Sequence, residues 1–441
     1  MSAIAIGGSA LAFLLVLILA RVPIALAMIL TGGGGIIWLS GPAILLSQFK
    51  TLAWGVFSNY DLSVAPLFLL MGHLAGRTGL SRDLFAGAHA LVGRVRGGVA
   101  IAAIGACAGF GAVCGSSLAT ASTMGKVALP ELRRLNYAPS LATGTLAAGG
   151  TLGILIPPSV VLILYAVIVE ANIVTMFMAA LAPGLLAVLG FALVIRLEVW
   201  MNPASGPRGA GLPPGELWRA LRGMAPVGLI FGVVIGGLYG GWFTPTPAAS
   251  VGVFLTGIYG LATGKLKLSG LRASLLETAS STAMIYLIIL GAELMKILMA
   301  RSGLPLAMAE ALGGAGWPPL AILALVLGIL ILLGAVMESL SLILLVVPFF
   351  WPVISGLDFG LDGEMLKIWF GILALVVVEL GLITPPVGLN VFVIHDIARD
   401  VPLARIFRGV LPFAAMEIVR VALLVAFPAL VLWLPGVLGG L

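Results

Sequence analysis

The stretch Gly149-Gly150-Thr151-Leu152-Gly153-Ile154-Leu155-Ile156-Pro157-Pro158-Ser159 places three glycines and a double proline inside an apolar segment. Proline removes a backbone donor and clashes with the preceding turn, and glycine adds backbone freedom, so a helix is expected to unwind here. In lipid, freed carbonyl and N–H groups are tolerated only where they line a protein cavity or bind a ligand. A second stretch of this kind, ELGLITPPVGLN, spans residues 379–390. Interruptions in corresponding halves of a chain are typical of the binding site of a secondary transporter.

The composition is that of a membrane protein. Of the 441 residues, 61% are hydrophobic and only 9% are charged, and many apolar segments are long enough to cross a bilayer as helices. The alternation typical of outer-membrane β-strands is weak. The formal net charge of +6 fits basic cytoplasmic loops and requires no nucleic acid as a partner. The sequence therefore predicts an all-α polytopic membrane protein.

The two halves of the sequence follow one plan. In the first half we expect an interfacial amphipathic piece near 44–58, five spans near 3–20, 22–40, 62–76, 140–170 and 174–196, and a re-entrant hairpin made of 97–113 and 117–130. The first span has no basic segment before it and no clear cleavage site, so we expect it to stay uncleaved. Four pairs of landmarks lie 222 to 228 residues apart: Pro23 and Pro247, Arg77 and Arg301, Ser116 and Glu338, Pro157 and Pro385.

This plan predicts an inverted repeat. Five crossings are an odd number, so the second copy enters the membrane from the opposite side. We expect a first repeat at 1–197, a cytoplasmic connector at 198–224, and a second repeat at 225–441 whose broken span lies at 366–398. On this topology, 17 Lys and Arg residues fall on one side and 3 on the other, with those inside apolar segments left out. The positive-inside rule then places both termini in the periplasm.

The predicted tip of the first hairpin, residues 114–125, is a cluster of small hydroxyl residues and glycines. Hydroxyl groups and freed carbonyls are hard oxygen ligands, suited to a partly dehydrated alkali cation or to a carboxylate. Close helix packing is the alternative interpretation, because small residues let helices approach each other. Next to the broken segment at 151–159, we favour a cation site.

The second tip carries a carboxylate, Glu338, deep in an apolar region. A charge there is unfavourable by several kcal/mol unless it is partnered, and a bound cation is one such partner. A structural ion pair or a protonated carboxyl is the alternative. Glu379 is a possible participant that could equally face a neighbouring helix, and Asn390 can both donate and accept hydrogen bonds.

An enzyme is not expected. The three histidines are scattered and lack metal-site spacing, and an intramembrane serine protease using Gly115-Ser116-Ser117 would need a histidine at membrane depth. No Gly-x-x-x-x-Gly-Lys-Ser/Thr segment is present, so the chain offers no ATPase site of its own. Transport energy is therefore expected from an ion gradient or from a partner.

At these residues the sequence resembles the large membrane subunit (DctM-like) of the tripartite ATP-independent periplasmic (TRAP) transporters. The matching stretches are PLFLLMGHLAGRTGLSRDLF (66–85), CGSSLATASTMGKVALPELRR (114–134), LATGTLAAGGTLGILIPPSVVLILY (141–165), GVVIGGLYGGWFTPTPAAS (232–250) and ELGLITPPVGLNVFV (379–393). The resemblance implies a sodium-driven importer of organic acids, such as C4-dicarboxylates or sialic-acid-like substrates, in the bacterial inner membrane. It also implies an elevator movement, a periplasmic substrate-binding protein, and a small four-helix membrane subunit, here expected as a separate chain.

The resemblance also implies which residues bind sodium and substrate. In the first half these are Ser116, Ser117, Thr120, Gly150, Thr151 and Pro157. In the second half they are Glu338, Ser339, Thr384, Pro385, Gly388 and Asn390. Glu338 departs from the family pattern, which usually has aspartate there, and the extra methylene moves the carboxylate oxygens.

Two other functions fit the sequence. A stand-alone divalent-anion symporter of related architecture would take up substrate without a binding protein. A structural or channel-like subunit would give a sodium-independent flux that does not saturate.

Overall fold

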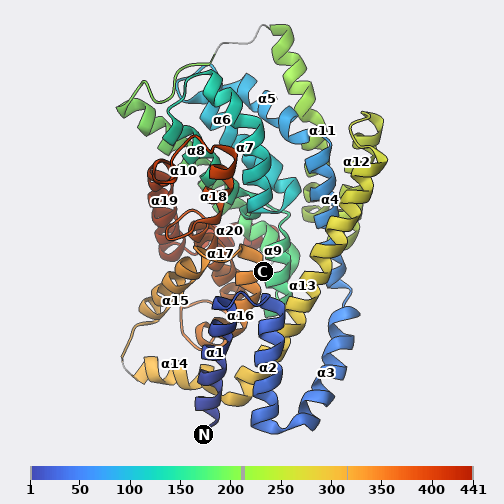
Figure 1. Cartoon of the computed structure of the whole chain (residues 1–441), viewed down its shortest axis with the longest axis vertical. Coiled ribbons are helices and arrows are strands. Elements are labelled where there is room, and N and C mark those ends of the chain that lie inside the picture. The colour runs from blue at the N-terminus through green and yellow to red at the C-terminus, as the bar shows by residue number, and fades with distance from the viewer. Residues whose placement is uncertain (1, 210–213, 315, 440–441) are drawn as a thin grey trace.

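The described part of the chain consists of helices and the loops between them (Figure 1). The structure is a computed structural model that describes residues 2–209, 214–314 and 316–439. Within those ranges the only extended pairing is an isolated antiparallel β-bridge between Arg96 and Arg208. The predicted all-α class is confirmed.

Helices α1 to α10 form the first half of the chain. They are α1 (Ala3–Leu19), α2 (Ile24–Ser40), α3 (Pro42–Phe57), α4 (Val64–Arg77), α5 (Leu80–Val92), α6 (Gly98–Cys114), α7 (Ser117–Arg134), α8 (Pro139–Leu155), α9 (Val160–Val169) and α10 (Ile173–Met201). Helix α10 continues into the segment expected as a connector, so that only about a dozen residues separate it from the next helix.

Helices α11 to α20 form the second half. They are α11 (Pro214–Tyr239), α12 (Pro245–Ala262), α13 (Leu268–Ser302), α14 (Leu304–Gly314), α15 (Pro319–Gly334), α16 (Ser339–Ile354), α17 (Gly363–Gly381), α18 (Leu389–Ile397), α19 (Leu403–Ala426) and α20 (Ala429–Val437). Helix α13 of the second half is continuous over 35 residues. In the first half, α3 and α4 are two separate helices joined through residues 58–63. No proline interrupts the α13 segment, which explains its continuity.

Both halves contain a helical hairpin with a short turn. Gly115 ends α6 with a φ of +65°, a value that suits glycine, and the Ser116 hydroxyl then caps α7 by accepting from the Ala119 N–H. In the second hairpin, Ala335 ends α15 and Glu338 caps α16. The turns therefore fall at the residues that the sequence predicts for the two tips.

Both predicted helix interruptions are present. Helix α8 ends at Leu155, α9 begins at Val160, and the two helices are bent by 44° relative to each other. In the second half α17 ends at Gly381 and α18 begins at Leu389. The Pro157–Pro158 and Pro385–Pro386 peptide bonds are both cis.

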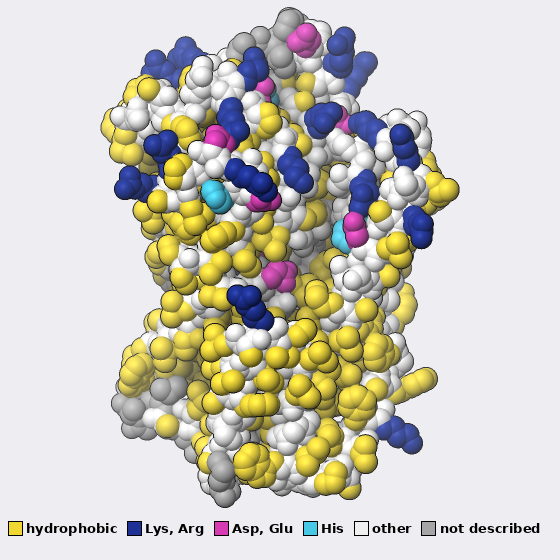
Figure 2. All heavy atoms as spheres, in the orientation of Figure 1, with side chains coloured by type: hydrophobic (Ala, Val, Ile, Leu, Met, Phe, Trp, Pro, Cys, Tyr) yellow, Lys and Arg dark blue, Asp and Glu magenta, His cyan; other side chains and the backbone are white. Residues whose placement is uncertain are grey.

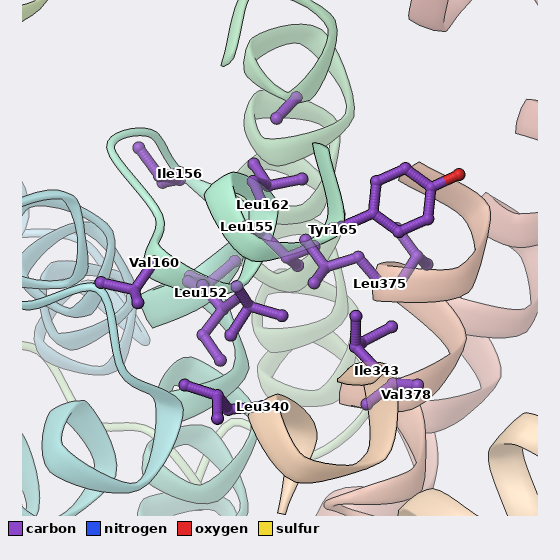
Figure 3. Close-up of a cluster of buried hydrophobic side chains, with 14 of the residues drawn as sticks. Leu152, Leu155, Ile156, Val160, Leu162, Tyr165, Leu340, Ile343, Leu375 and Val378 are labelled. Atoms are coloured by element: carbon purple, nitrogen blue, oxygen red, sulfur yellow. The ribbon is translucent and has the colours of Figure 1, made fainter. Parts of the chain in front are cut away.

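The short helix after each break packs against the hairpin of the other half. Helix α9 packs against α16 of the second hairpin, and α18 packs against α7 of the first. Figure 3 shows apolar side chains of α8 and α9, among them Leu155 and Leu162, meeting Ile343 of α16 and Val378 of α17 in one buried cluster. The first break and the second hairpin are therefore embedded in a common apolar core.

A buried ion pair joins α19 to α10. Arg420 and Glu417 are 1% and 2% exposed, and the Arg420 guanidinium donates to the Glu417 carboxylate. Arg420 Nη1 also donates to the Pro183 carbonyl of α10 at 2.9 Å. The hydrogen bond from the buried Arg420 guanidinium to the Pro183 carbonyl thus joins two long helices.

The charge distribution divides the molecule along its long axis. Figure 2 shows Lys and Arg side chains gathered on the visible face at the end where α5 and α11 lie, whereas the opposite half is mostly hydrophobic. Within the described ranges, four helices are long and apolar enough to cross a membrane, or five if the bent α8–α9 pair counts as one span. The other apolar helices are shorter. Among them, α6, α15 and α16 belong to the hairpins, whereas α1 and α2, which were predicted as spans, have 17 residues each.

Candidate functional site

The carboxylate of Glu379 lies between the two hairpin tips. Ser117 Oγ donates to Glu379 Oε2, and Ser339 Oγ donates to Glu379 Oε1 at 2.6 Å. Because Ser117 and Ser339 are the first residues of α7 and α16, the carboxylate faces the positive ends of two helix dipoles. One carboxylate of the second half is therefore hydrogen-bonded to the tips of both hairpins.

Glu379 is fully buried in α17, with 0% of its surface exposed. Among the described residues, none of the ion pairs includes Glu379. A carboxylate in an apolar interior requires either a proton or a cation to balance it, since two serine hydroxyls supply hydrogen bonds but no charge. The site thus combines a buried acid with neutral oxygen donors.

The first hairpin packs tightly on α8 at two glycines. A Cβ atom at Gly153 would lie 2.5 Å from Thr120 Oγ1 and 2.7 Å from the Ser116 carbonyl oxygen. A Cβ atom at Gly150 would lie 2.9 Å from Asn390 Nδ2. Residues 150 and 153 share a face of α8, so both the first tip and the start of α18 lie against that face.

Two buried oxygens at this face have no hydrogen-bond partner within the described part of the chain. They are Thr120 Oγ1 and Asn390 Oδ1, and both residues are 0% exposed. Asn390 Nδ2, by contrast, donates to the Ala147 carbonyl at 3.3 Å, which orients the amide. Buried acceptors that lack a donor are unusual, and they suit a cation or a ligand hydrogen-bond donor.

The second hairpin packs on α17 in the same manner as the first packs on α8. A Cβ atom at Gly381 would lie 2.6 Å from the carbonyl carbon of Gly334, just as one at Gly111 would lie 2.5 Å from Cα of Gly153. The Gly388 N–H donates to the Ala335 carbonyl at 2.9 Å. Close backbone contact therefore fixes each tip against its broken segment.

Replacing Gly381 by alanine is expected to lower the free energy of unfolding by about 1–3 kcal/mol, because the added methyl group meets backbone atoms that cannot rotate away. The measurement is thermal unfolding of the purified protein in detergent. Gly328→Ala on α15 is the control, since no heavy atom lies within 4 Å of its added methyl group. Equal unfolding midpoints for the two variants would contradict the close approach.

Glu338 has a local role at the second tip. Its Oε2 accepts from the Ser341 N–H at 3.2 Å and lies 3.3 Å from Ser341 Oγ, so the carboxylate caps α16. Within the described ranges no ion pair includes Glu338, so the alternative of a structural ion pair has no support, and the favoured cation partner stays a prediction.

The other predicted residues differ in exposure. Thr151 and Pro157 are buried, and Thr151 Oγ1 donates to the Ala148 carbonyl at 2.7 Å. Thr384 is half-buried, with Oγ1 donating to the Gly381 carbonyl at 3.1 Å, and Pro385 is exposed. The first break is thus enclosed by protein, whereas the second reaches the protein surface.

Sequence reasoning left Glu379 among the possible participants, and the structure places it at the centre. The available signal was an ionisable residue at the end of a long apolar run, about six residues before a double proline. Its partners Ser117 and Ser339 were both predicted as site residues, and the structure brings them to the same carboxylate.

Comparison with known proteins identifies the family. Residues 11–430 match the family model described as the tripartite ATP-independent periplasmic transporter, DctM component. The chain is 35% identical over 412 residues to the C4-dicarboxylate TRAP transporter large permease protein of Pseudomonas aeruginosa, covering 91% of this chain and 94% of the relative. It is 31% identical over 429 residues to the sialic acid TRAP transporter large permease protein of Vibrio cholerae, covering 95% and 96%.

A solved structure shares the fold. The YdaH transporter of Alcanivorax borkumensis superposes with a TM-score of 0.65 at 16% identity, covering 88% of this chain and 90% of that one. At this sequence identity, the structural similarity supports only the shared multi-span helical fold. The match over nearly the whole length shows that the chain belongs to the DctM family of TRAP transporter components, multi-pass membrane permeases that are not enzymes.

Proposed function

We propose that this chain imports an organic acid across the bacterial inner membrane and that sodium ions drive the import. The observation that carries the proposal is the Glu379 carboxylate, which is fully buried and hydrogen-bonded to both hairpin tips. A sodium ion nearby would balance its charge and draw the tips together. Sodium binding and tip closure would thereby be one event.

Oxygen atoms on α7 and at the start of α18 support a sodium site. Thr120 lies three residues after Ser117 on α7, which puts both hydroxyls on one helix face. Thr120 Oγ1 and Asn390 Oδ1 are buried acceptors without a hydrogen-bond donor among the described residues. Hydroxyl, amide and carboxylate oxygens, together with carbonyls freed at a helix break, are the ligands that sodium-coupled transporters use.

The substrate is an anionic organic acid. Helices α7 and α16 begin at the site, and their N-terminal dipoles favour a carboxylate group of a bound solute. The names of the two relatives mention C4-dicarboxylate and sialic acid, both of which carry carboxylates. We assign this chain to the same substrate class, with the choice of acid made by the binding protein.

An elevator movement on an inverted repeat accounts for the paired architecture. Each hairpin packs closely against its broken helix at a pair of glycines, Gly111–Gly153 in the first half and Gly334–Gly381 in the second. In addition, α9 packs against the second hairpin and α18 against the first. These features support repeats at 1–197 and 225–441 around a cytoplasmic connector. With the basic end in the cytoplasm, both termini lie in the periplasm.

Membership of a tripartite family implies two further components. We propose a small four-helix membrane subunit on a separate chain and a periplasmic binding protein that delivers the acid. The second candidate function is a stand-alone symporter. The two candidates differ in whether uptake requires a binding protein.

Reconstitution tests the function. Purified protein with the small subunit is placed in proteoliposomes, and uptake of a labelled acid is measured with and without a sodium gradient and with and without the binding protein. We expect saturable uptake only when both are present. Uptake without the binding protein would identify a stand-alone symporter, and unsaturable flux without sodium would identify a channel.

Ser117→Ala is expected to raise the sodium concentration needed for half-maximal uptake by about tenfold, because a buried charged hydrogen bond to Glu379 is lost. Sodium titration in the same proteoliposomes measures the shift. Ser250→Ala on α12, where the serine is exposed, is the matched control and should leave the titration unchanged. A wild-type titration for Ser117→Ala contradicts a role of this hydroxyl in sodium binding.

A further inference from the structure

Two loops at the basic end of the molecule are fixed to each other by backbone hydrogen bonds. The Gly97 N–H donates to the Gly206 carbonyl at 3.0 Å, and the Gly209 N–H donates to the Gly93 carbonyl at 3.0 Å. Between these bonds, Arg96 and Arg208 form the isolated β-bridge. The loop after α5 and the loop after α10 are therefore held in one arrangement, although about 110 residues separate them.

This arrangement forms an arginine-lined cavity of about 480 Å³. We call it the arginine pocket, and its basic residues are Arg94, Arg96, Arg196 and Arg208. Trp200 also lines it, and no acidic side chain does. Among the described residues, the ion pairs do not include Arg96, Arg196 or Arg208.

Like charges gathered around a cavity repel each other, and a bound anion relieves that repulsion. Guanidinium groups bind phosphate through two parallel hydrogen bonds, which makes arginine more selective than lysine for this group. The pocket therefore has the chemistry of a phosphate site.

An exposed apolar stripe on α10 leads into the pocket. Leu185, Leu189, Leu193 and Leu197 recur every four residues and are 52%, 66%, 52% and 47% exposed. Arg196 lies directly before the last of these leucines, and Trp200 follows it by three residues and is 78% exposed. Outward-facing leucines with arginine and tryptophan at one end are typical of a helix that passes from the hydrocarbon region into the headgroup layer.

We propose that the arginine pocket binds the phosphate headgroup of an anionic phospholipid whose acyl chains lie along the leucine stripe of α10. The stripe distinguishes a lipid from free phosphate, because only a lipid contacts both surfaces at once. Basic pockets of this kind at the cytoplasmic side of membrane helices are known to hold such headgroups. The site is separate from the transport site, and its occupancy does not depend on sodium.

Lipid titration by native mass spectrometry of the full-length, detergent-purified protein tests the proposal. The probes are diphosphatidylglycerol, phosphatidylcholine and inorganic phosphate. We expect the wild-type protein to retain diphosphatidylglycerol in preference to the other two. The double variant Arg96→Gln/Arg208→Gln should weaken its binding by about twenty-five-fold, since each arginine near an anionic headgroup contributes roughly fivefold.

The matched control is Lys267→Gln/Arg272→Gln, which removes the same number of charges from exposed positions outside the pocket. It should change lipid affinity by less than about twofold. Arg96→Lys/Arg208→Lys keeps the charge but loses the planar fork, and an intermediate affinity is expected. Thermal unfolding of all variants checks that each is folded.

Three outcomes would overturn the proposal. Equal losses in the pocket and control variants would indicate general surface charge, and inorganic phosphate bound as tightly as the lipid would indicate a soluble phosphate site. Loss of the second membrane component from the complex, with lipid affinity unchanged, would identify the pocket as a protein interface.

Discussion

Glu379→Gln is expected to reduce sodium-dependent uptake by about a hundredfold or more, because two hydrogen bonds to a charged group are replaced by weaker ones. The amide keeps the shape of the side chain but carries no negative charge. Ser117 and Ser339 could still donate to its single carbonyl oxygen, yet the charge that attracts sodium would be gone. Uptake in proteoliposomes, measured with the binding protein and a sodium gradient, gives the result.

Glu277→Gln is the control for this substitution. Glu277 also is a glutamate on a long helix, but its side chain is 51% exposed and pairs with Arg77 at the surface. Its loss should change uptake by less than about twofold. If Glu379→Gln transports at the wild-type rate, the carboxyl is neutral in the working protein and its role is to hold the tips together.

Arg420→Met is expected to lower the free energy of unfolding by about 3–5 kcal/mol. The substitution leaves Glu417 buried without its charge partner, and it also removes the donor to the Pro183 carbonyl of α10. Most of the loss comes from the isolated carboxylate, so the double variant Glu417→Gln/Arg420→Met should recover a large part of it. Thermal unfolding in detergent measures both variants.

Arg399→Met provides the comparison for Arg420→Met. Arg399 pairs with Asp396 three residues before it, as Arg420 pairs with Glu417, but the Arg399 and Asp396 side chains are 79% and 73% exposed. An exposed pair of this kind contributes only about 0–1 kcal/mol. Similar unfolding midpoints for Arg399→Met and Arg420→Met would show that burial does not make the Glu417–Arg420 pair important.

The helix breaks and hairpin turns were predictable because their signals are local. Proline, glycine and N-capping serines act on the backbone within one turn of themselves, and the sequence around Ser116 and Pro157 shows them directly. The position of Arg420 also had a local signal, since Glu417 precedes it by three residues in an apolar helix.

The centre of the site was harder to predict because it depends on packing between distant segments. Ser117 and Glu379 are 262 residues apart in the chain, and no periodicity fixes which face of α17 turns toward α7. Glu338 shows the opposite case. Its hydrogen-bond partner Ser341 lies only three residues further along the chain, so this contact is local. The cation partner expected for Glu338 stays a prediction.

The two double prolines differ in their exposure. Pro157 and Pro158 are buried, whereas Pro385 and Pro386 are exposed. The second break is therefore open to contact at the protein surface in this conformation, whereas the first break is closed off by the helices around it. A solute reaches the first break only after those helices move apart.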